Sequence, residues 1–280
     1  MPKSLKIYIF LLVLIFIGII WADATKERPI DWRESYSLNE KIPFGLYVFN
    51  QEHKAIFKPQ TVEKFSESPY EFLDKNYNTY DSIYDIEGTI LLIQNKAAID
   101  EYSENELFYF ASHRNAIFYS NSNFSQKFAD SLGFEIEYSN DFADSLQFKI
   151  NRNQKAGNFY FNKGINTAYF SKIDTSKTEV LGTQINSKGE EFANFIKVKH
   201  LNGNFYLHLQ PVAFTNYYLL NKNSQYAEDI LGYIPSKSPI YWKVKQYDNE
   251  ELSSSPMRYL LSQPALRWAW YLAWISLIIF

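Results

Sequence analysis

"GTILLIQN", from Gly88 to Asn95, is a continuous apolar run bounded by turn and polar residues. A run of this length is typical of a strand that is buried on both faces of a parallel sheet. A helix is predicted next, because Ser103 and Glu106 form a capping-box pattern ahead of an apolar stretch. "NAIFYS" (Asn115–Ser120) predicts a second buried strand, and Gly133 ends the short helix after it. This alternation favours a parallel α/β unit with helices packed over the sheet.

The segments on either side of this unit extend the prediction. Asn39–Phe57 predicts a helix with Pro43 near its start, where a missing N–H is tolerated. From about Leu146 the pattern changes to short strands with turns between them. The chain returns to a helix at Ser224–Ile234 and to a strand at Ser238–Val244. We therefore expect an α/β domain with an antiparallel β-extension.

The composition is that of one globular domain with mixed surface charge. The chain has 280 residues, 46% hydrophobic and 18% aromatic, which is enough for one sizeable core. Its net charge is −3 and both signs are mixed along the chain, so no nucleic-acid partner is expected. The absence of cysteine excludes disulfides, thiolate metal sites and cysteine nucleophiles. No glycine-rich phosphate loop follows either buried strand, and we expect no cofactor.

Both ends of the chain carry apolar runs. Residues 7–22 are uncharged, follow Lys3 and Lys6, and are long enough for a short transmembrane helix. A cleaved signal peptide is the alternative, because residues 22–24 have the A-x-A form. Residues 263–280 begin a second apolar run and stop within it, so we expect the start of a second transmembrane helix in a truncated chain.

These runs divide the chain into four parts. They are a cytoplasmic N-terminus (1–6), a transmembrane helix (7–22), an extracytoplasmic α/β domain (23–262) and the start of a second transmembrane helix (263–280). A long domain translocates largely regardless of its charge, so we place it outside. The expected location is the inner (cytoplasmic) membrane with a periplasmic main domain, and the membrane is one expected partner.

The segment around His208 predicts a hairpin. Asn202-Gly203 is a strong signal for a two-residue turn, which places Leu201 opposite Asn204. Because side chains alternate along a strand, His200 and His208 fall on opposite faces and cannot share a metal ion. We therefore expect no metal site.

His208 is also the main candidate for a catalytic residue, because it lies near the carboxyl end of its strand. A hydrolase would pair it with a hydroxyl such as that of Ser122, in the loop after the second buried strand. Ser122 lacks the neighbouring glycines of a nucleophile elbow, however. His208 shares its predicted face with Lys197 and Lys199, so a solvated face is the simpler interpretation. An enzyme is not expected.

Three blocks of the sequence carry a resemblance to a known family. They are "DWRESYSLNEKIPFGLYVF" (Asp31–Phe49), "GNFYLHLQPVAFTNYYLL" (Gly203–Leu220) and "SSPMRYLLSQPALRWAWYL" (Ser254–Leu272). Their content and order resemble the Bacteroidetes membrane proteins of domain-of-unknown-function family 4350, over nearly the whole chain. The resemblance implies a class I glutamine-amidotransferase-like (flavodoxin-like) sheet with transmembrane helices on both sides. It also implies an envelope setting linked to MoxR-type ATPases.

The chain departs from an amidotransferase at the residues that such a reaction needs. The cysteine nucleophile is missing, and "HLQP" around His208 has Gln210 where a glutamate would be needed. The sequence therefore predicts a membrane-anchored, non-catalytic binding domain with a protein partner in the envelope. A degenerate or serine-dependent hydrolase and a glycan-binding module are the alternatives. The expected contact residues are Tyr206, His208, Thr215 and Asn216 near the strand ends, and Trp32 and Tyr36 as a second patch.

Overall fold

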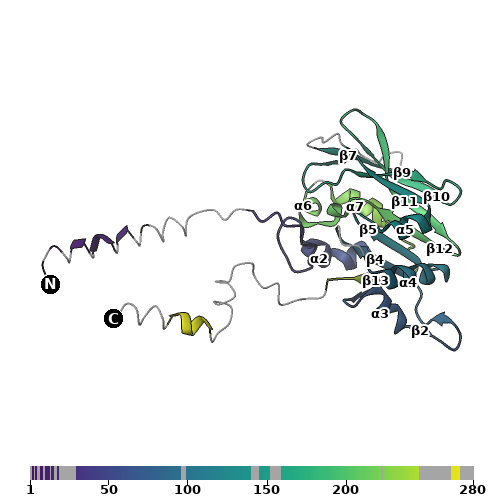
Figure 1. Cartoon of the computed structure of the whole chain (residues 1–280), viewed down its shortest axis with the longest axis horizontal. Coiled ribbons are helices and arrows are strands. Elements are labelled where there is room, and N and C mark those ends of the chain that lie inside the picture. The colour runs from purple at the N-terminus through teal and green to yellow at the C-terminus, as the bar shows by residue number, and fades with distance from the viewer. Residues whose placement is uncertain are drawn as a thin grey trace.

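The computed structural model describes residues 30–95, 99–139, 145–151, 159–221, 223–245 and 266–271, with a few scattered residues between Pro2 and Gly18. In these parts of the chain, one mixed sheet of eleven strands carries helices on both faces (Figure 1). A separate two-stranded hairpin lies beside it.

The strands are β1 (Val62–Phe65), β2 (Tyr77–Asn78), β3 (Ile83–Tyr84), β4 (Thr89–Ile93), β5 (Ala116–Ser120), β6 (Phe134–Tyr138), β7 (Leu146–Ile150), β8 (Phe159–Phe161), β9 (Ala168–Ile173), β10 (Thr178–Ile185), β11 (Glu191–His200), β12 (Gly203–His208) and β13 (Ile240–Lys243). The helices are α2 (Tyr47–Ile56), α3 (Pro69–Asp74), α4 (Glu101–Ser112), α5 (Gln126–Leu132), the 3-10 helix η1 (Pro211–Phe214), α6 (Asn216–Leu219) and α7 (Ser224–Leu231).

One half of the sheet is parallel. Strands β1, β13, β4, β5 and β12 are neighbours in that order and all run in the same direction. β4 and β5 are buried along their whole length, as predicted from their apolar sequences. Leu91 and Phe118 belong to the hydrophobic core on one face, and Ile90 and Ile117 to the core on the other.

The other half is antiparallel and continues from β12 without a break. Strands β11, β10, β7 and β8 follow in order, and β9 joins β6 to β11. Phe148, Phe161 and Phe195 from these strands lie in the same core cluster as Leu91 and Phe118 of the parallel half. The two halves therefore form one folded body.

The turn between β11 and β12 lies one residue earlier than predicted. His200 pairs with Gly203, so the turn residues are Leu201 and Asn202, and Leu201 has a φ of 51°. Gly203 belongs to the strand because a Cβ there would lie 2.0 Å from the carbonyl oxygen of Ala111. Close packing against α4 thus overrides the local preference for a turn at Asn202-Gly203.

The helices cover both faces of the sheet. Residues of α2, η1, α6 and α7 pack on one face, and residues of α3, α4 and α5 pack on the other. α4 begins at Asp100 instead of the predicted Ser103, because the Asp100 carboxylate accepts the Ser103 N–H. The Ser103 hydroxyl donates to the same carboxylate at 2.6 Å and accepts the Tyr70 N–H. Gly133 ends α5 in the left-handed conformation, as predicted.

The predicted fold class is wrong. A flavodoxin-like parallel sheet with an added extension was expected, but the antiparallel strands make up half of a single mixed sheet and contribute to its core. The physical reason is the density of inward-facing phenylalanines in the antiparallel strands, which need the helices of the same face as cover.

The flanking transmembrane helices, and the inner-membrane location that depends on them, are also contradicted. In the described parts of the chain, no helix combines the length and the apolar character needed to cross a bilayer. Half of residues 7–22 and most of residues 263–280 lie outside the described residues.

Candidate functional site

The contact surface predicted near the strand ends lies in the interior. Tyr206, Thr215 and Asn216 are buried, and His208 has no exposed surface at all. The face expected to be solvated is covered because the connection from β12 to β13 crosses it and places α7 over His208. These four side chains therefore do not form a contact surface.

His208 is the centre of a buried polar network. Its Nδ1 atom lies 2.9 Å from Oγ of Ser120, which is directly opposite on the neighbouring strand β5. Its Nε2 atom lies 3.2 Å from the hydroxyl of Tyr226 on α7. That hydroxyl accepts a hydrogen bond from Nδ2 of Asn194. Like His208, Ser120, Tyr226 and Asn194 are fully buried.

Burial determines the charge of this network. It lowers the pKa of His208 from its ordinary value near 6.5 to about 3, so the imidazole is neutral at pH 7. Two tautomers fit these distances. In one, Tyr226 donates to Nε2 and Nδ1–H donates to Ser120; in the other, Ser120 donates to Nδ1 and Nε2–H donates to Tyr226. In both, the four side chains are sealed from solvent, so the network contributes to the core.

Ser122, the hydroxyl proposed for the hydrolase, has other partners. It donates a hydrogen bond to Oδ1 of Asn95, and its carbonyl oxygen accepts one from Asn166. The serine next to His208 is instead Ser120, at the last position of β5. The parallel pairing of Ser120 with His208 would have identified it, but the sequence alone does not give the strand register.

Asn216 and Thr215 are structural. The Asn216 side chain accepts the Val48 N–H at 2.8 Å and donates to the carbonyl oxygens of Glu40 and Ile42. It thus ties the start of α6 to the start of α2. The Thr215 hydroxyl donates to the carbonyl oxygen of Val212.

The two residues of the second predicted patch differ in exposure. Trp32 is 38% exposed and packs on Phe44 and Tyr217, with Nζ of Lys163 5.4 Å from its ring centroid. Tyr36 is buried, and burial raises the pKa of its hydroxyl well above the ordinary value. Only Trp32 of this pair presents a surface to a partner.

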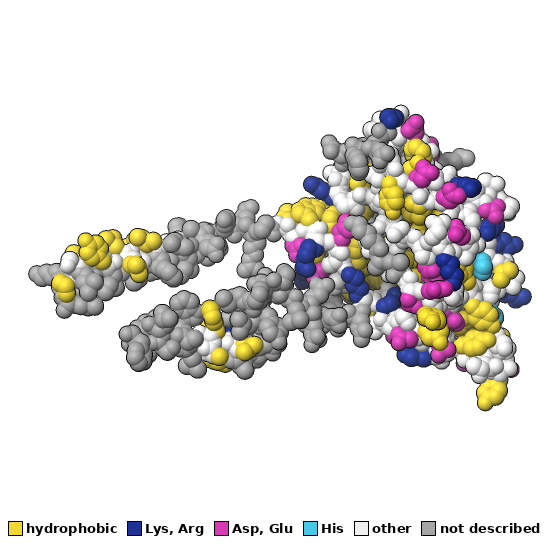
Figure 2. Space-filling model, in the orientation of Figure 1, with side chains coloured by type: hydrophobic (Ala, Val, Ile, Leu, Met, Phe, Trp, Pro, Cys, Tyr) yellow, Lys and Arg dark blue, Asp and Glu magenta, His cyan; other side chains and the backbone are white. Residues whose placement is uncertain are grey.

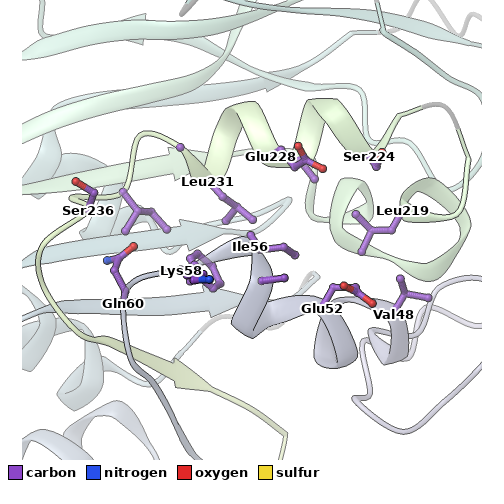
Figure 3. A pocket seen from close by; sticks show the side chains of 15 residues that line it. Val48, Glu52, Ile56, Lys58, Gln60, Leu219, Ser224, Glu228, Leu231 and Ser236 are labelled. Atoms are coloured by element: carbon purple, nitrogen blue, oxygen red, sulfur yellow. The ribbon is translucent and has the colours of Figure 1, made fainter.

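A groove with a partly apolar lining lies between α2 and α7. It encloses about 530 Å³, within the range typical of ligand sites. Figure 3 shows Ile56 and Leu231 facing each other across its middle, from α2 and the end of α7. The same groove is lined by Val48, Glu52, Ala55, Phe57, Lys58, Gln60, Leu219, Ser224, Ala227, Glu228, Gly232, Ile234 and Ser236.

The two ends of the groove differ in charge. Glu52 on α2 and Glu228 on α7 lie toward one end, while Lys58 and Gln60 lie toward the other (Figure 3). Glu52, Glu228 and Lys58 are all exposed. No hydrogen bond or ion pair within the described residues engages any of these three side chains. Elsewhere, on the face seen in Figure 2, acidic and basic side chains are interspersed.

No known protein family matches the chain, and no curated protein matches it. The resemblance to family 4350 therefore stays a prediction. Among solved structures, the exo-β-1,4-mannosidase Op5Man5 from Opitutaceae bacterium strain TAV5 is similar at 11% identity and a TM-score of 0.40, over 69% of this chain. A β-galactosidase from Rahnella sp. R3 is similar at 11% identity and a TM-score of 0.34, over 52% of this chain.

The chain spans 39% of the length of the mannosidase and 22% of that of the galactosidase. A cytoplasmic protein, STM3548, from Salmonella typhimurium is similar at 9% identity and a TM-score of 0.29. Because all three likenesses are weak in sequence and in superposition, they carry no information on an activity of this chain.

Proposed function

We propose that this protein is a non-catalytic binding domain and that the groove between α2 and α7 holds a segment of a protein partner. The observation that carries the proposal is the contrast between the sealed carboxyl end of the parallel strands and the open groove. The residues at the carboxyl end of the parallel strands, where open α/β sheets usually bind ligands, are sealed around His208. The groove is open and partly apolar, with unpaired charges at its ends.

A hydrolase that uses the Ser120–His208 pair is the competing proposal, favoured by the 2.9 Å contact between the two side chains. It would require α7 to move away, because Tyr226 of that helix packs on His208 and covers it. Substrate cannot reach either group in the structure, since both are fully buried. Binding in the groove needs no such rearrangement.

Photo-crosslinking in living cells tests the proposal. A photoreactive amino acid replaces Ser236, which lines the groove, or Tyr102, which is exposed on α4 on the opposite face of the sheet. We expect a discrete adduct from position 236 that is absent from position 102 and is lost when Ala55→Trp fills the groove. Equal adducts at both positions, or an adduct unaffected by Ala55→Trp, would overturn the proposal.

A further inference from the structure

The charges of the groove define which kind of segment fits it. Three features bear on this: the small side chains that open the groove, the apolar surface of its middle, and the unpaired charged groups at its ends. The inference below rests on the proposed function of the groove.

Small residues on both helices make the groove deep. Ala55 on α2 and Ala227 on α7 both line it, and Gly232 follows α7 directly. Two larger side chains there would close the gap between the helices. The floor beneath is provided by Leu231 and Ile234, which are buried in the core. An occupant therefore meets apolar surface over the middle of the groove.

Two carboxylates border one end of the groove. Glu52 and Glu228 are on different helices, and both line the groove. In the part of the chain that the structure describes, neither carboxylate has an ion-pair partner. A cation placed between two carboxylates that border one space is attracted to both. The complementary group is a lysine ammonium or an arginine guanidinium.

The opposite end carries the reverse charge. The Lys58 ammonium likewise has no acidic partner in the described part of the chain. Gln60 beside it is already engaged, since its Nε2 donates to the carbonyl oxygens of Pro235 and Ser238. Lys58 is therefore the group available to an anion at this end.

We propose that the groove binds a peptide segment of a partner protein with a defined polarity. The segment carries a lysine or arginine between Glu52 and Glu228, apolar side chains over Ile56 and Leu231, and a carboxylate near Lys58. A polyanion such as nucleic acid is disfavoured by the two carboxylates, and a wholly apolar ligand would leave all three charges unused.

Selection from a random library of 12-residue peptides displayed on phage, with the full-length chain as bait, tests this inference. We expect enriched peptides that have a basic residue and an acidic residue separated by apolar ones. Their affinity should fall about threefold with Glu52→Gln or Glu228→Gln and about tenfold with both, at low salt. Lys58→Gln should weaken them by about threefold, and the matched variant Lys172→Gln, remote from the groove, should leave them unchanged.

The outcomes separate the two proposals. Peptides that bind Ala55→Trp as well as the natural chain would overturn both the groove as the site and its polarity. Peptides that no longer bind Ala55→Trp but bind Glu52→Gln and Glu228→Gln as tightly as the natural chain would support the groove as the site and overturn its polarity. Enrichment of acidic peptides would also overturn the polarity, and a selection without any enriched sequence would overturn both.

Discussion

The Oγ atom of Ser120 lies 2.9 Å from Nδ1 of His208, and neither side chain reaches solvent. A serine hydroxyl beside a histidine imidazole is an arrangement that nucleophilic catalysis uses. Here the hydroxyl of Tyr226 on the far side of the imidazole, and the cover provided by α7, make it part of the core. We therefore expect the pair to affect the stability of the folded chain.

The folded chain should become less stable at acidic pH because of His208. Burial depresses its folded-state pKa to about 3, below the unfolded value near 6.5, so its contribution is complete above pH 6.5 and is lost as the pH falls toward 3. The free energy of unfolding should fall by about 1.4 kcal/mol per pH unit more in the natural chain than in His208→Asn. Urea unfolding between pH 4 and 7.5 measures both slopes. Equal slopes would contradict a neutral, buried imidazole.

Glu104 should have the opposite effect on the pH dependence of stability. Burial raises the pKa of its carboxyl, although the Ser125 hydroxyl donates to it at 2.8 Å. Its contribution is therefore present below the unfolded pKa and is lost as the pH rises through the raised value. Glu104→Gln keeps an acceptor for Ser125, so we expect it to be more stable relative to the natural chain at pH 7 than at pH 4. A relative stability that does not change over this range, followed by thermal unfolding, would refute the burial argument.

Gly203 should tolerate no side chain. A Cβ at this position would lie 2.0 Å from the carbonyl oxygen of Ala111 and 2.3 Å from that of Asn115. Gly203→Ala should destabilise the chain by at least about 2 kcal/mol, because backbone atoms of α4 must move. Gly189→Asn is the matched control: its φ of 81° suits asparagine and no atom lies within 4 Å. Similar unfolding midpoints for the two variants would show that β12 does not pack as described.

Asn216 should hold α2 in place. Its side chain makes three hydrogen bonds to backbone groups of Val48, Glu40 and Ile42. Asn216→Leu leaves these groups unpaired and should cost about 3 kcal/mol. Hydrogen exchange at the Val48 amide should rise together with the loss of stability. Asn221→Ala is the control: this asparagine is exposed, and its side chain donates to the carbonyl oxygen of Tyr217. Its replacement should change stability by less than about 0.5 kcal/mol.

The sequence predicted the strands whose residues follow one pattern over their whole length. β4 and β5 contain almost only apolar residues and were predicted from that composition. β7 lies where short strands were predicted from Leu146 onward, and its buried and half-buried side chains alternate. The short edge strand β1 was not predicted. Its sequence, VEKF, has apolar residues only at its ends.

The errors come from tertiary contacts. Asp100 and Ser103 are both suitable caps for α4; Asp100 caps it, and the Ser103 hydroxyl accepts from the Tyr70 N–H, 33 positions away. The turn at Asn202-Gly203 was displaced by contact with Ala111. The groove brings residues 48–60 together with residues 219–236, and neither segment shows by itself that it faces the other.

The hydrogen bond from Nζ of Lys245 to the carbonyl oxygen of Ser35, at 2.6 Å, places the chain that follows β13 next to the chain that leads into α2. Two segments that are distant in sequence but adjacent in space can be joined by a short linker without disturbing the sheet between them. A circular permutation that links residue 245 to residue 30, with new ends at the exposed turn of Leu201 and Asn202, should therefore keep the fold.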